Sequence, residues 1–328
     1  MTRLLLPILS LLVAGLFAAS LLIGPAGLSP VDSLAALIRG DRLAETLVMR
    51  EIRLPRALLA VLVGAALGLA GAAMQGYLRN PLAEPGLIGV SGSAALGAVL
   101  ALQTGFAGAY LFALPLSALA GAVVAVLLIL MLAGARGGSI TLILAGIAVS
   151  ALAGALTSLV LNLSPNPFAA SEIVFWMMGS LVDRSMDHVL LAAPFIALGA
   201  LVLLTQARAL DALTLGEDAA ASMGVHLARL RLLLVLGVAS MVGAATAVAG
   251  AIGFVGLVVP HVLRPLVGAR PSALLPASAI GGAALVLMAD IAVRLILPER
   301  DLKLGVLTAL VGAPLFLHLI YKTRAQGL

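Results

Sequence analysis

The sequence predicts an all-α polytopic membrane protein of about ten transmembrane helices with an inverted internal repeat. Of its 328 residues, 62% are hydrophobic and 10% are charged, and the mean hydropathy is +1.21. Soluble domains carry about 25% charged residues, so a chain this poor in charge belongs in a lipid bilayer. Its apolar stretches are mostly about 20 residues long, which suits membrane-spanning helices rather than barrel strands. Residues 1–328 are expected to form one transmembrane domain.

Ten spans can be placed along the chain. The first lacks a convincing cleavage site for a signal peptide and is expected to be retained. The eighth is short and is interrupted by Pro260 and Pro265. An even number of spans places both termini on one side of the membrane. The predicted spans cover residues 4–24, 57–78, 86–104, 109–133, 140–163, 189–206, 232–252, 254–267, 272–297 and 304–321.

Lys and Arg are distributed almost evenly between the two sides. With both termini in the cytoplasm, the inner segments hold ten of these residues and the outer segments hold nine, five of them between Arg39 and Arg56. The positive-inside rule counts Lys and Arg, so this outer cluster works against the expected orientation. Elsewhere the bias favours cytoplasmic termini. The outer cluster should therefore have another reason to exist, and a docking surface is one candidate.

Residues 79–91 interrupt the helical pattern with two prolines, two glycines and Glu84 between two apolar spans. Proline lacks a backbone N–H and glycine is a poor helix former, so the helix should break here. In hydrocarbon, a broken backbone survives only where protein or a water-filled cavity covers it. The interruption therefore marks a position with a structural or functional task.

The second and seventh spans share a pattern that indicates an internal repeat. Residues 63–72 match residues 242–251 at seven of ten positions, and the same offset of 179 carries Pro81 onto Pro260. Five spans separate the two copies, so they cross the membrane in opposite directions, as in the inverted repeats of transporters. The alternative is a chance likeness between small-residue packing faces, which are common in membranes.

The longest polar segment between spans, residues 207–231, is predicted to carry two short amphipathic helices on the cytoplasmic side. The two acids that follow Gly216 occupy a first helical turn, where they favour the positive end of the helix dipole. Gly224 ends that helix, and residues 225–230 can form another. Such a pair suits contact with a soluble partner; an ordinary long loop is the alternative.

The outer segment before the second span is rich in arginine. Arg53 and Arg56 flank Pro55 at the mouth of the second helix, and Arg50 precedes them. The forked guanidinium group of arginine pairs well with carboxylates, which favours a docking surface for an acidic partner. Snorkelling of an Arg at a helix end is the commoner explanation for a single residue. Three arginines within seven residues favour docking.

No metal, cofactor or ATP site is predicted in this chain. It has no cysteine to supply thiolate ligands, and its four histidines lie too far apart for metal-ligand spacing. A Walker A loop must end in Gly-Lys-Ser/Thr, and neither Lys303 nor Lys322 fits, so an ATPase that drives transport would be another chain. The net charge of +5 is spread over single positions and loops, so it is no signal for nucleic acid.

Two features of the sequence bear on other classes of protein. Gly89-Val-Ser91-Gly92 fits the G-x-S-G pattern of rhomboid intramembrane proteases, with His261 or His318 as the partner, but so short a motif is weak in a chain with 35 glycines. A proton- or sodium-driven carrier would need acids at mid-span, and only Asp290 comes near. We expect Asp290 to form a structural ion pair with Arg294, four residues later.

Several specific motifs match a known family. They are Arg53-Leu-Pro-Arg56, Gln75, Asn80 to Ser91, Leu215 to Gly224, Gly250 to Arg264, Ala289 to Arg294 and Leu304 to Phe316. Together they resemble the FecCD permeases, the membrane subunits of ATP-binding-cassette (ABC) importers for ferric siderophores, haem and cobalamin. The resemblance runs from about residue 50 to residue 322, and the residues before it match only in hydropathy.

The resemblance implies a homodimer in the bacterial inner membrane, with both termini cytoplasmic and the substrate path at the dimer interface, lined partly by the fifth and tenth spans. It also implies two copies of a separate ATPase, which hold ATP and Mg²⁺, and a periplasmic binding protein whose acidic residues meet permease arginines. The implied sites are the coupling residues Gly216, Glu217, Asp218, Ala221, Met223 and Gly224, the docking residues Arg53, Arg56 and Arg294 (with Arg50 added on charge alone), and the gate residues Gly138, Ser139 and Thr141.

Under this resemblance the interruption at residues 79–91 does not touch the cargo. Asn80 to Gly86 becomes a packed cytoplasmic-side turn that sets the entry angle of the third helix. Glu84 is expected to contact a helix end or a partner rather than to carry protons.

The cargo expected first is an iron complex, haem before a ferric siderophore, with cobalamin as the closest alternative. An aromatic content of 4% and the lack of a His or Cys cluster argue against metal ligation along the path. The permease is expected to offer weak contacts that permit release, and the affinity belongs to the binding protein.

Overall fold

The protein is a helical bundle in its computed structural model, which describes residues 2–24, 28–38, 43–110, 112–134, 138–164, 167–296 and 302–325. These ranges contain helices and loops and no strand. Seven helices are long and apolar enough to cross a membrane, and three shorter helices are also apolar. The prediction of an all-α polytopic membrane protein is confirmed.

Ten described helices agree in position with the ten predicted spans, seven of them long enough to cross a membrane and three shorter. The third begins later than expected, because a short 3-10 turn, η2 (Pro85–Ile88), precedes it. The ten helices are α1 (Thr2–Leu22), α4 (Leu54–Leu78), α5 (Val90–Gln103), α6 (Ala113–Ala133), α7 (Ser139–Asn162), α9 (Met186–Thr205), α12 (Leu227–Ala249), α13 (Val255–Leu263), α14 (Pro271–Ile296) and α15 (Leu304–Ala325).

Shorter helices connect the spans. The helix expected over residues 225–230 is not separate, because α12 begins at Leu227 and runs on into the bundle. This part of the sequence-based prediction was wrong. The connecting elements are α2 (Pro30–Ile38), α3 (Ala44–Leu47), the π-helical turn η1 (Val48–Arg53), the 3-10 turn η3 (Phe106–Gly108), α8 (Pro167–Met177), α10 (Ala207–Leu213), α11 (Glu217–Ser222) and the 3-10 turn η4 (Arg264–Val267).

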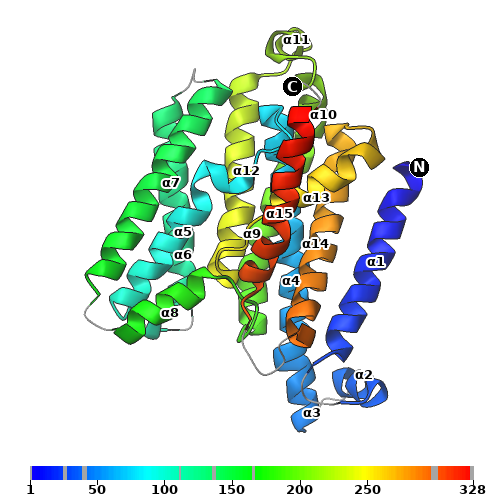
Figure 1. The fold of residues 1–328 in the computed structure, drawn as a ribbon, viewed down its shortest axis with the longest axis vertical. Coiled ribbons are helices and arrows are strands. Elements are labelled where there is room, and N and C mark those ends of the chain that lie inside the picture. The colour runs from blue at the N-terminus through cyan, green and yellow to red at the C-terminus, as the bar shows by residue number, and fades with distance from the viewer. Residues whose placement is uncertain are drawn as a thin grey trace.

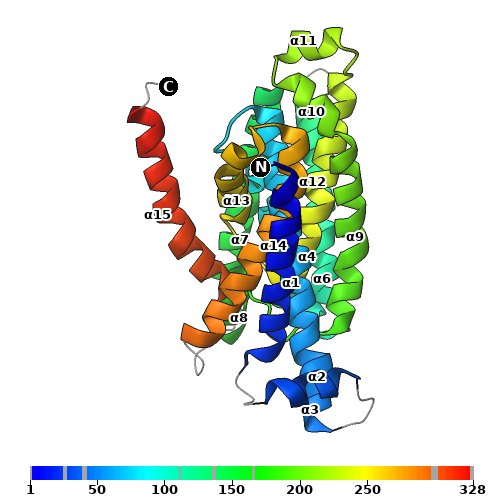
Figure 2. The same ribbon diagram turned by 90° about the vertical axis from the view of Figure 1, so that its right-hand side faces the viewer.

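The two ends of the bundle carry different elements. One end carries α2 and α3, and the opposite end carries α10 and α11 (Figure 1). We call these the α3 end and the α11 end. Helix α1 begins and α15 ends towards the α11 end, so the described chain starts and finishes on the same side. Figure 2 shows that α15 leans away from the other helices.

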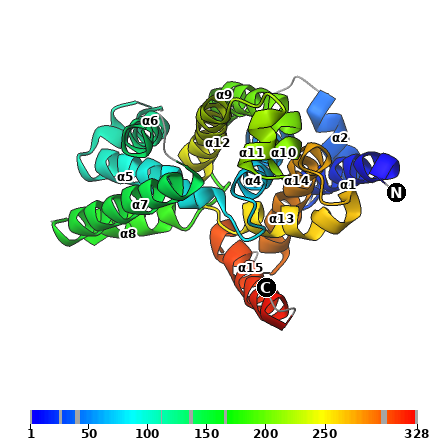
Figure 3. The same ribbon diagram turned by 90° about the horizontal axis from the view of Figure 1, so that it is seen from above.

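Seen from above, the helices form two groups (Figure 3). Helices α5 to α8 lie together on one side, and α1, α4, α13 and α14 lie on the other, with α9 and α12 between them. Helices α4 and α12 have the most buried spans, with 78% of each apolar window buried. The core of the protein is therefore built on these two helices.

Glycines let the central helices cross at close range. A Cβ on Gly68 of α4 would lie 2.0 Å from the carbonyl oxygen of Ser278 in α14, and a Cβ on Gly64 would lie 2.3 Å from that of Gly282. Helices α5 and α6 cross in the same way, because a Cβ on Gly97 would lie 2.1 Å from a carbonyl oxygen of α6. Small residues at such crossings allow the close backbone packing that holds membrane helices together.

Candidate functional site

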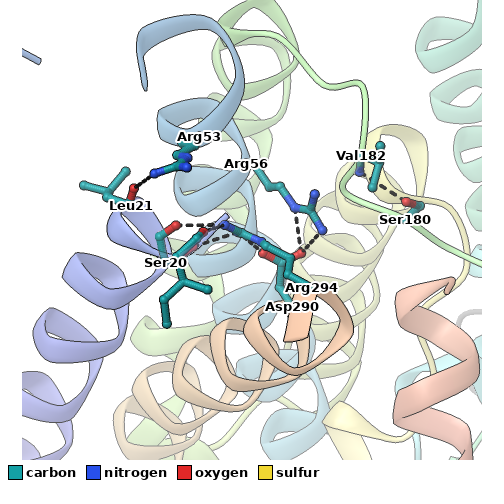
Figure 4. Close-up of polar contacts among 9 residues, drawn as sticks. Ser20, Leu21, Arg53, Arg56, Ser180, Val182, Asp290 and Arg294 are labelled. Carbon is teal, nitrogen blue, oxygen red and sulfur yellow. Dashed lines mark hydrogen bonds and ion pairs between the residues drawn. The ribbon is translucent and has the colours of Figure 1, made fainter. Parts of the chain in front are cut away.

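At the α3 end, arginines bind the C-terminus of α1. The Arg53 guanidinium Nη1 donates hydrogen bonds to the carbonyl oxygens of Leu21 at 2.9 Å and Leu22 at 3.2 Å (Figure 4). These carbonyls belong to the last turn of the helix and its end, where intrahelical donors are missing and the dipole is negative. Arg53 is only 4% exposed. It therefore fastens α1 to the start of α4.

Asp290 gathers two further arginines at this end. Its buried carboxylate accepts a hydrogen bond from Nε of Arg56 at 2.8 Å and forms an ion pair with Nη2 of Arg294 (Figure 4). Nη1 of Arg294 also donates to the carbonyl oxygens of Ser20 at 2.8 Å and Ile23 at 3.0 Å. The predicted pair of Asp290 and Arg294 is thus present, with Arg56 as a third member.

The same capping is found elsewhere on the α3 end. Arg50 donates to the carbonyl oxygen of Leu37 at the end of α2, at 2.8 Å from Nη2. Arg184 donates to the carbonyl oxygen of Val248 at the end of α12, at 2.6 Å. Burial lowers the pKa of the Arg184 guanidinium, and the nearby Asp183 carboxylate partly offsets this. Many of the arginines at this end of the bundle therefore bind backbone carbonyl oxygens, at the ends of three helices.

The four predicted docking residues differ in how far they reach the surface. The side chains of Arg53 and Arg294 are buried, whereas Arg50 is half-buried and 16% of the Arg56 side chain is exposed. Arg56 also lines a cavity of about 210 Å³ together with Glu51, Ile52 and the loop at residues 181–185. Docking remains a prediction for all four, and Arg50 and Arg56 are the ones placed to meet a partner directly.

The interruption at residues 79–91 is tied to a second break in the chain. The Glu84 carboxylate accepts a hydrogen bond from the backbone N–H of Phe254 at 3.0 Å. Phe254 has a φ of 67° and immediately precedes α13. A carboxylate at this position satisfies a free N–H and suits the positive end of the helix dipole. Glu84 contacts a helix end, as predicted.

Gln75 of α4 and Arg264, which follows α13, form a second polar contact between these parts of the chain. Nη2 of Arg264 donates to Oε1 of Gln75 at 2.7 Å, and Nε2 of Gln75 donates to the carbonyl oxygens of Gly256 and Leu257 at 3.3 Å. Gln75 is buried, so its amide needs these partners. These hydrogen bonds of Gln75 and Arg264 therefore hold α13 against α4.

At the α11 end, the part of the predicted coupling segment from Gly216 to Gly224 has the expected local structure. Gly216 has a φ of 108° and precedes α11, whose first turn contains Glu217 and Asp218. Met223 follows this helix and is 64% exposed, Ala221 is exposed, and Gly224 has a φ of 87°. Ala220 of this helix is fully buried and attaches the helix to the bundle.

The predicted gate residues lie beside this segment. A cavity of about 810 Å³ is lined by residues 138–141, at the start of α7, and by residues 215–219 of the coupling segment. Gly138, Ser139 and Thr141 are therefore brought together with Gly216, Glu217 and Asp218. Arg79 lines the same cavity and ends α4 with a φ of 49°. Sequence spacing gave no sign of this meeting, because the three segments are far apart in the chain.

Another polar contact at this end was also missed. Oδ1 of Asp211 accepts a hydrogen bond from the backbone N–H of Ser272 at 2.8 Å, and Asp211 lies 3.6 Å from the guanidinium of Arg270. The carboxylate caps the start of α14, which opens with Pro271. The sequence shows a proline at the start of α14. The acid that accepts the hydrogen bond there lies on another helix.

Comparisons with known proteins assign a family. The model of the FecCD transport family matches residues 11–322. The vitamin B12 import permease BtuC of Salmonella typhi is 40% identical and aligns over 96% of this chain and 94% of its own. The hemin permease HmuU of Yersinia pestis is 39% identical, over 84% of each chain. The uncharacterized ABC permease YvrB of Bacillus subtilis is 40% identical, over 86% of this chain and 81% of its own.

Solved structures agree with this fold. A metal-chelate-type ABC transporter in an inward-facing conformation is 36% identical, covers 97% of this chain and 98% of its own, and superposes with a TM-score of 0.86. PsaBC from Streptococcus pneumoniae in complex with Fab is 17% identical, over 80% of this chain and 88% of its own, with a TM-score of 0.53. The second likeness concerns the fold alone.

Proposed function

The chain belongs to the FecCD transport family and is the permease subunit of an ABC importer, and we propose that it moves a metal chelate across the bacterial inner membrane into the cytoplasm. A permease of this type works with a separate ATPase and a substrate-binding protein, so the chain is not an enzyme, and ATP and Mg²⁺ belong to the ATPase. The protease and the secondary carrier considered from the sequence are thereby set aside.

The proposed cargo rests mainly on the solved metal-chelate-type transporter, which is similar over nearly the whole chain. An iron complex is the cargo that the sequence favours, and the similarity to the hemin permease HmuU supports it. Cobalamin is supported equally, because the alignment to the vitamin B12 permease BtuC covers 96% of the chain. Both cargoes are chelates of a size that needs a wide path.

Uptake by the reconstituted importer tests the cargo. The chain, its ATPase and its binding protein are placed in liposomes, and haem, a ferric siderophore and cobalamin are supplied in parallel. We expect ATP-dependent accumulation of one chelate, and a Walker A variant of the ATPase is the control. Accumulation of cobalamin alone would contradict the iron preference, and accumulation of none would contradict the proposed function.

We propose that two copies of the chain form the path between them, lined partly by α7 and α15. Both helices present large apolar side chains outside the subunit: Ile140 of α7 is 72% exposed, and Leu310 of α15 is 65% exposed. Figure 3 shows α15 pointing away from the other helices, on the side of the subunit where α7 and α8 lie. A second copy facing this side would cover both helices and enclose a path.

The contact between the gate and the coupling segment suggests how the ATPase acts on this path. The proposed ATPase contact is helix α11, which exposes Ala221, together with the exposed Met223 that follows it. Under this proposal the α11 end, towards which α1 begins and α15 ends, faces the cytoplasm. The shared cavity means that a shift of α11 changes the walls around Ser139 and Thr141. The coupling residues can thus open or close the inner end of α7 without a long relay.

At the opposite end, we propose that a periplasmic binding protein docks through acidic residues on Arg50 and Arg56. These two have exposed surface. Arg53 and Arg294 contribute indirectly, because they hold α1 in place and Arg294 also holds Asp290. Charge pairing across such a rim mainly raises the association rate and is screened by salt.

Neutralising the exposed pair should weaken this docking. For Arg50→Gln/Arg56→Gln we expect the association rate with the binding protein to fall about tenfold at low salt, and the difference from wild type to shrink as salt rises. Surface plasmon resonance on nanodisc-embedded permease measures this. Lys303→Gln removes a charge elsewhere and serves as the control. Unchanged association of the double variant at low salt would defeat this assignment.

A further inference from the structure

A second pocket at the α11 end is basic, and the proposed coupling role covers only its edge at Met223 and Gly224. It has a volume of about 420 Å³ and lies between the end of α9, α10 and the start of α12. Its polar lining includes Arg208, His226 and Arg229. Figure 2 shows α10 and α11 standing over the neighbouring helices α9 and α12 at this place.

The positive charge of this pocket is not neutralised within the described chain. Arg208 and Arg229 are exposed, and neither forms a hydrogen bond or ion pair with any described residue. None of the described residues that line the pocket is acidic; Glu217 and Asp218 line the separate gate cavity, and Asp211 is engaged at the start of α14. Two free guanidinium groups in a concave site favour an anion with several oxygen acceptors.

The start of α12 adds to this preference. Helix α12 has 23 residues and begins after His226, which lines the pocket, and no described side chain caps it. Its first N–H groups and the positive end of its dipole therefore add to the field of the two arginines. The helix start supports the assignment, which rests on the basic cavity itself.

The floor of the pocket is apolar and continues onto the side of the bundle. Leu233 lines the pocket, and beyond it the neighbouring spans expose Leu201 and Leu204 of α9 and Leu236 of α12. These leucines are 63%, 42% and 42% exposed, and both helices are long and apolar enough to span the membrane. An occupant that is anionic at one end and apolar below matches this surface, whereas a soluble anion matches only its upper part.

We propose that this pocket, formed by Arg208, His226 and Arg229 above Leu233, binds the headgroup phosphate of an anionic phospholipid of the cytoplasmic leaflet. The assignment rests on the proposed function, because the coupling role of α11 places this end of the bundle in the cytoplasm. Basic pockets at the cytoplasmic ends of transmembrane helices are suited to anionic headgroups. The lipid would hold α10 and the start of α12 next to the coupling helix.

Lipid retention by the purified full-length chain tests this proposal. The chain is reconstituted in phosphatidylcholine with added phosphatidylglycerol, extracted, and examined by native mass spectrometry. We expect Arg208→Gln/Arg229→Gln to retain phosphatidylglycerol at least about tenfold less than wild type, with phosphatidylcholine unchanged. Arg270→Gln/Lys303→Gln removes the same charge outside the pocket and should retain lipid like wild type. Thermal unfolding in pure phosphatidylcholine verifies that both variants fold.

Three results would overturn the proposal. Equal phosphatidylglycerol retention by the pocket variant and the control variant would show that no specific site exists. Unchanged lipid retention with lost binding of the ATPase would assign the pocket to that partner. Loss of inorganic phosphate binding in the pocket variant, with phosphatidylglycerol retention unchanged, would show a site for the free anion. Because retention is a binding measurement, it can fail while uptake succeeds, which separates this proposal from the proposed function.

Discussion

Asp290→Ala is expected to lower the free energy of unfolding by about 3–5 kcal/mol, the range measured when one member of a buried ion pair is removed. The carboxylate is 1% exposed and lies between two cationic side chains, Arg56 and Arg294. Its loss leaves two guanidinium groups with no counter-charge in a buried site. Arg294 keeps its bonds to Ser20 and Ile23, but Arg56 has no other partner that the structure describes.

The variant is compared with Glu51→Ala, which removes an acid from an exposed position at the same end. That control should change stability by no more than about 0.5 kcal/mol. Adding Arg56→Met to Asp290→Ala should recover part of the loss, because it removes one unpaired charge. Thermal unfolding in detergent measures all four proteins, including wild type. Equal stability of the Asp290 and Glu51 variants would mean that the cluster contributes nothing to the fold.

Gly68→Ala is expected to destabilise the protein by about 2 kcal/mol or more, although alanine is ordinarily the better helix former. The added methyl would lie 2.0 Å from the carbonyl oxygen of Ser278, so α4 and α14 must move apart. A backbone atom cannot turn aside as a flexible side chain can. The separation would also weaken the contact of neighbouring Gly64 with Gly282.

Gly15→Ala on α1 is the matched control. A Cβ at this position meets no other atom within 4 Å, so the substitution should be neutral or stabilising by up to about 1 kcal/mol. Gly97→Ala, at the crossing of α5 and α6, should act in the same direction as Gly68→Ala. The measurements are thermal unfolding and the yield of monodisperse protein after extraction. A Gly68→Ala protein as stable as the Gly15→Ala protein would show that the crossing tolerates the methyl.

The helical spans could be predicted from the sequence because the bilayer imposes their length and hydropathy. The connecting helices could not be placed with the same accuracy, since they are short and their ends depend on contacts outside the segment. The start of α12 illustrates this: residues 225–230 can form a helix, but only packing on the bundle makes it continuous with the seventh span.

The arginines show a different limit of sequence reasoning. The near-even distribution of Lys and Arg indicated that the cluster around Arg53 needed an explanation beyond topology, and a docking surface was inferred. The structure adds another explanation, which is that Arg50, Arg53 and Arg294 bind carbonyl oxygens at the ends of α1 and α2. Backbone carbonyls occur at every position, so no residue pattern could identify these partners.

The acidic residues were easier to interpret, although only locally. The spacing of Asp290 and Arg294 on one helix face correctly predicted their ion pair, because residues four apart are neighbours on a helix. Arg56 belongs to the same cluster but comes from another helix, and sequence spacing holds no information about that contact. The contact of Glu84 with Phe254 was predicted only as a helix end of unknown identity.

The dependence of α1 and α4 on α14 has a consequence for synthesis. Both early helices pack against α14, which carries Asp290, Arg294 and Gly282. The chain between Arg53 and Arg294 is 294 − 53 = 241 residues long, which a ribosome translates in roughly 10–50 s at about 5–20 residues per second. Throughout that interval Gly64, Gly68 and Arg56 of α4 lack their native partners on α14. The nascent subunit must therefore be shielded from other apolar chains and from proteases until its ninth span has entered the membrane.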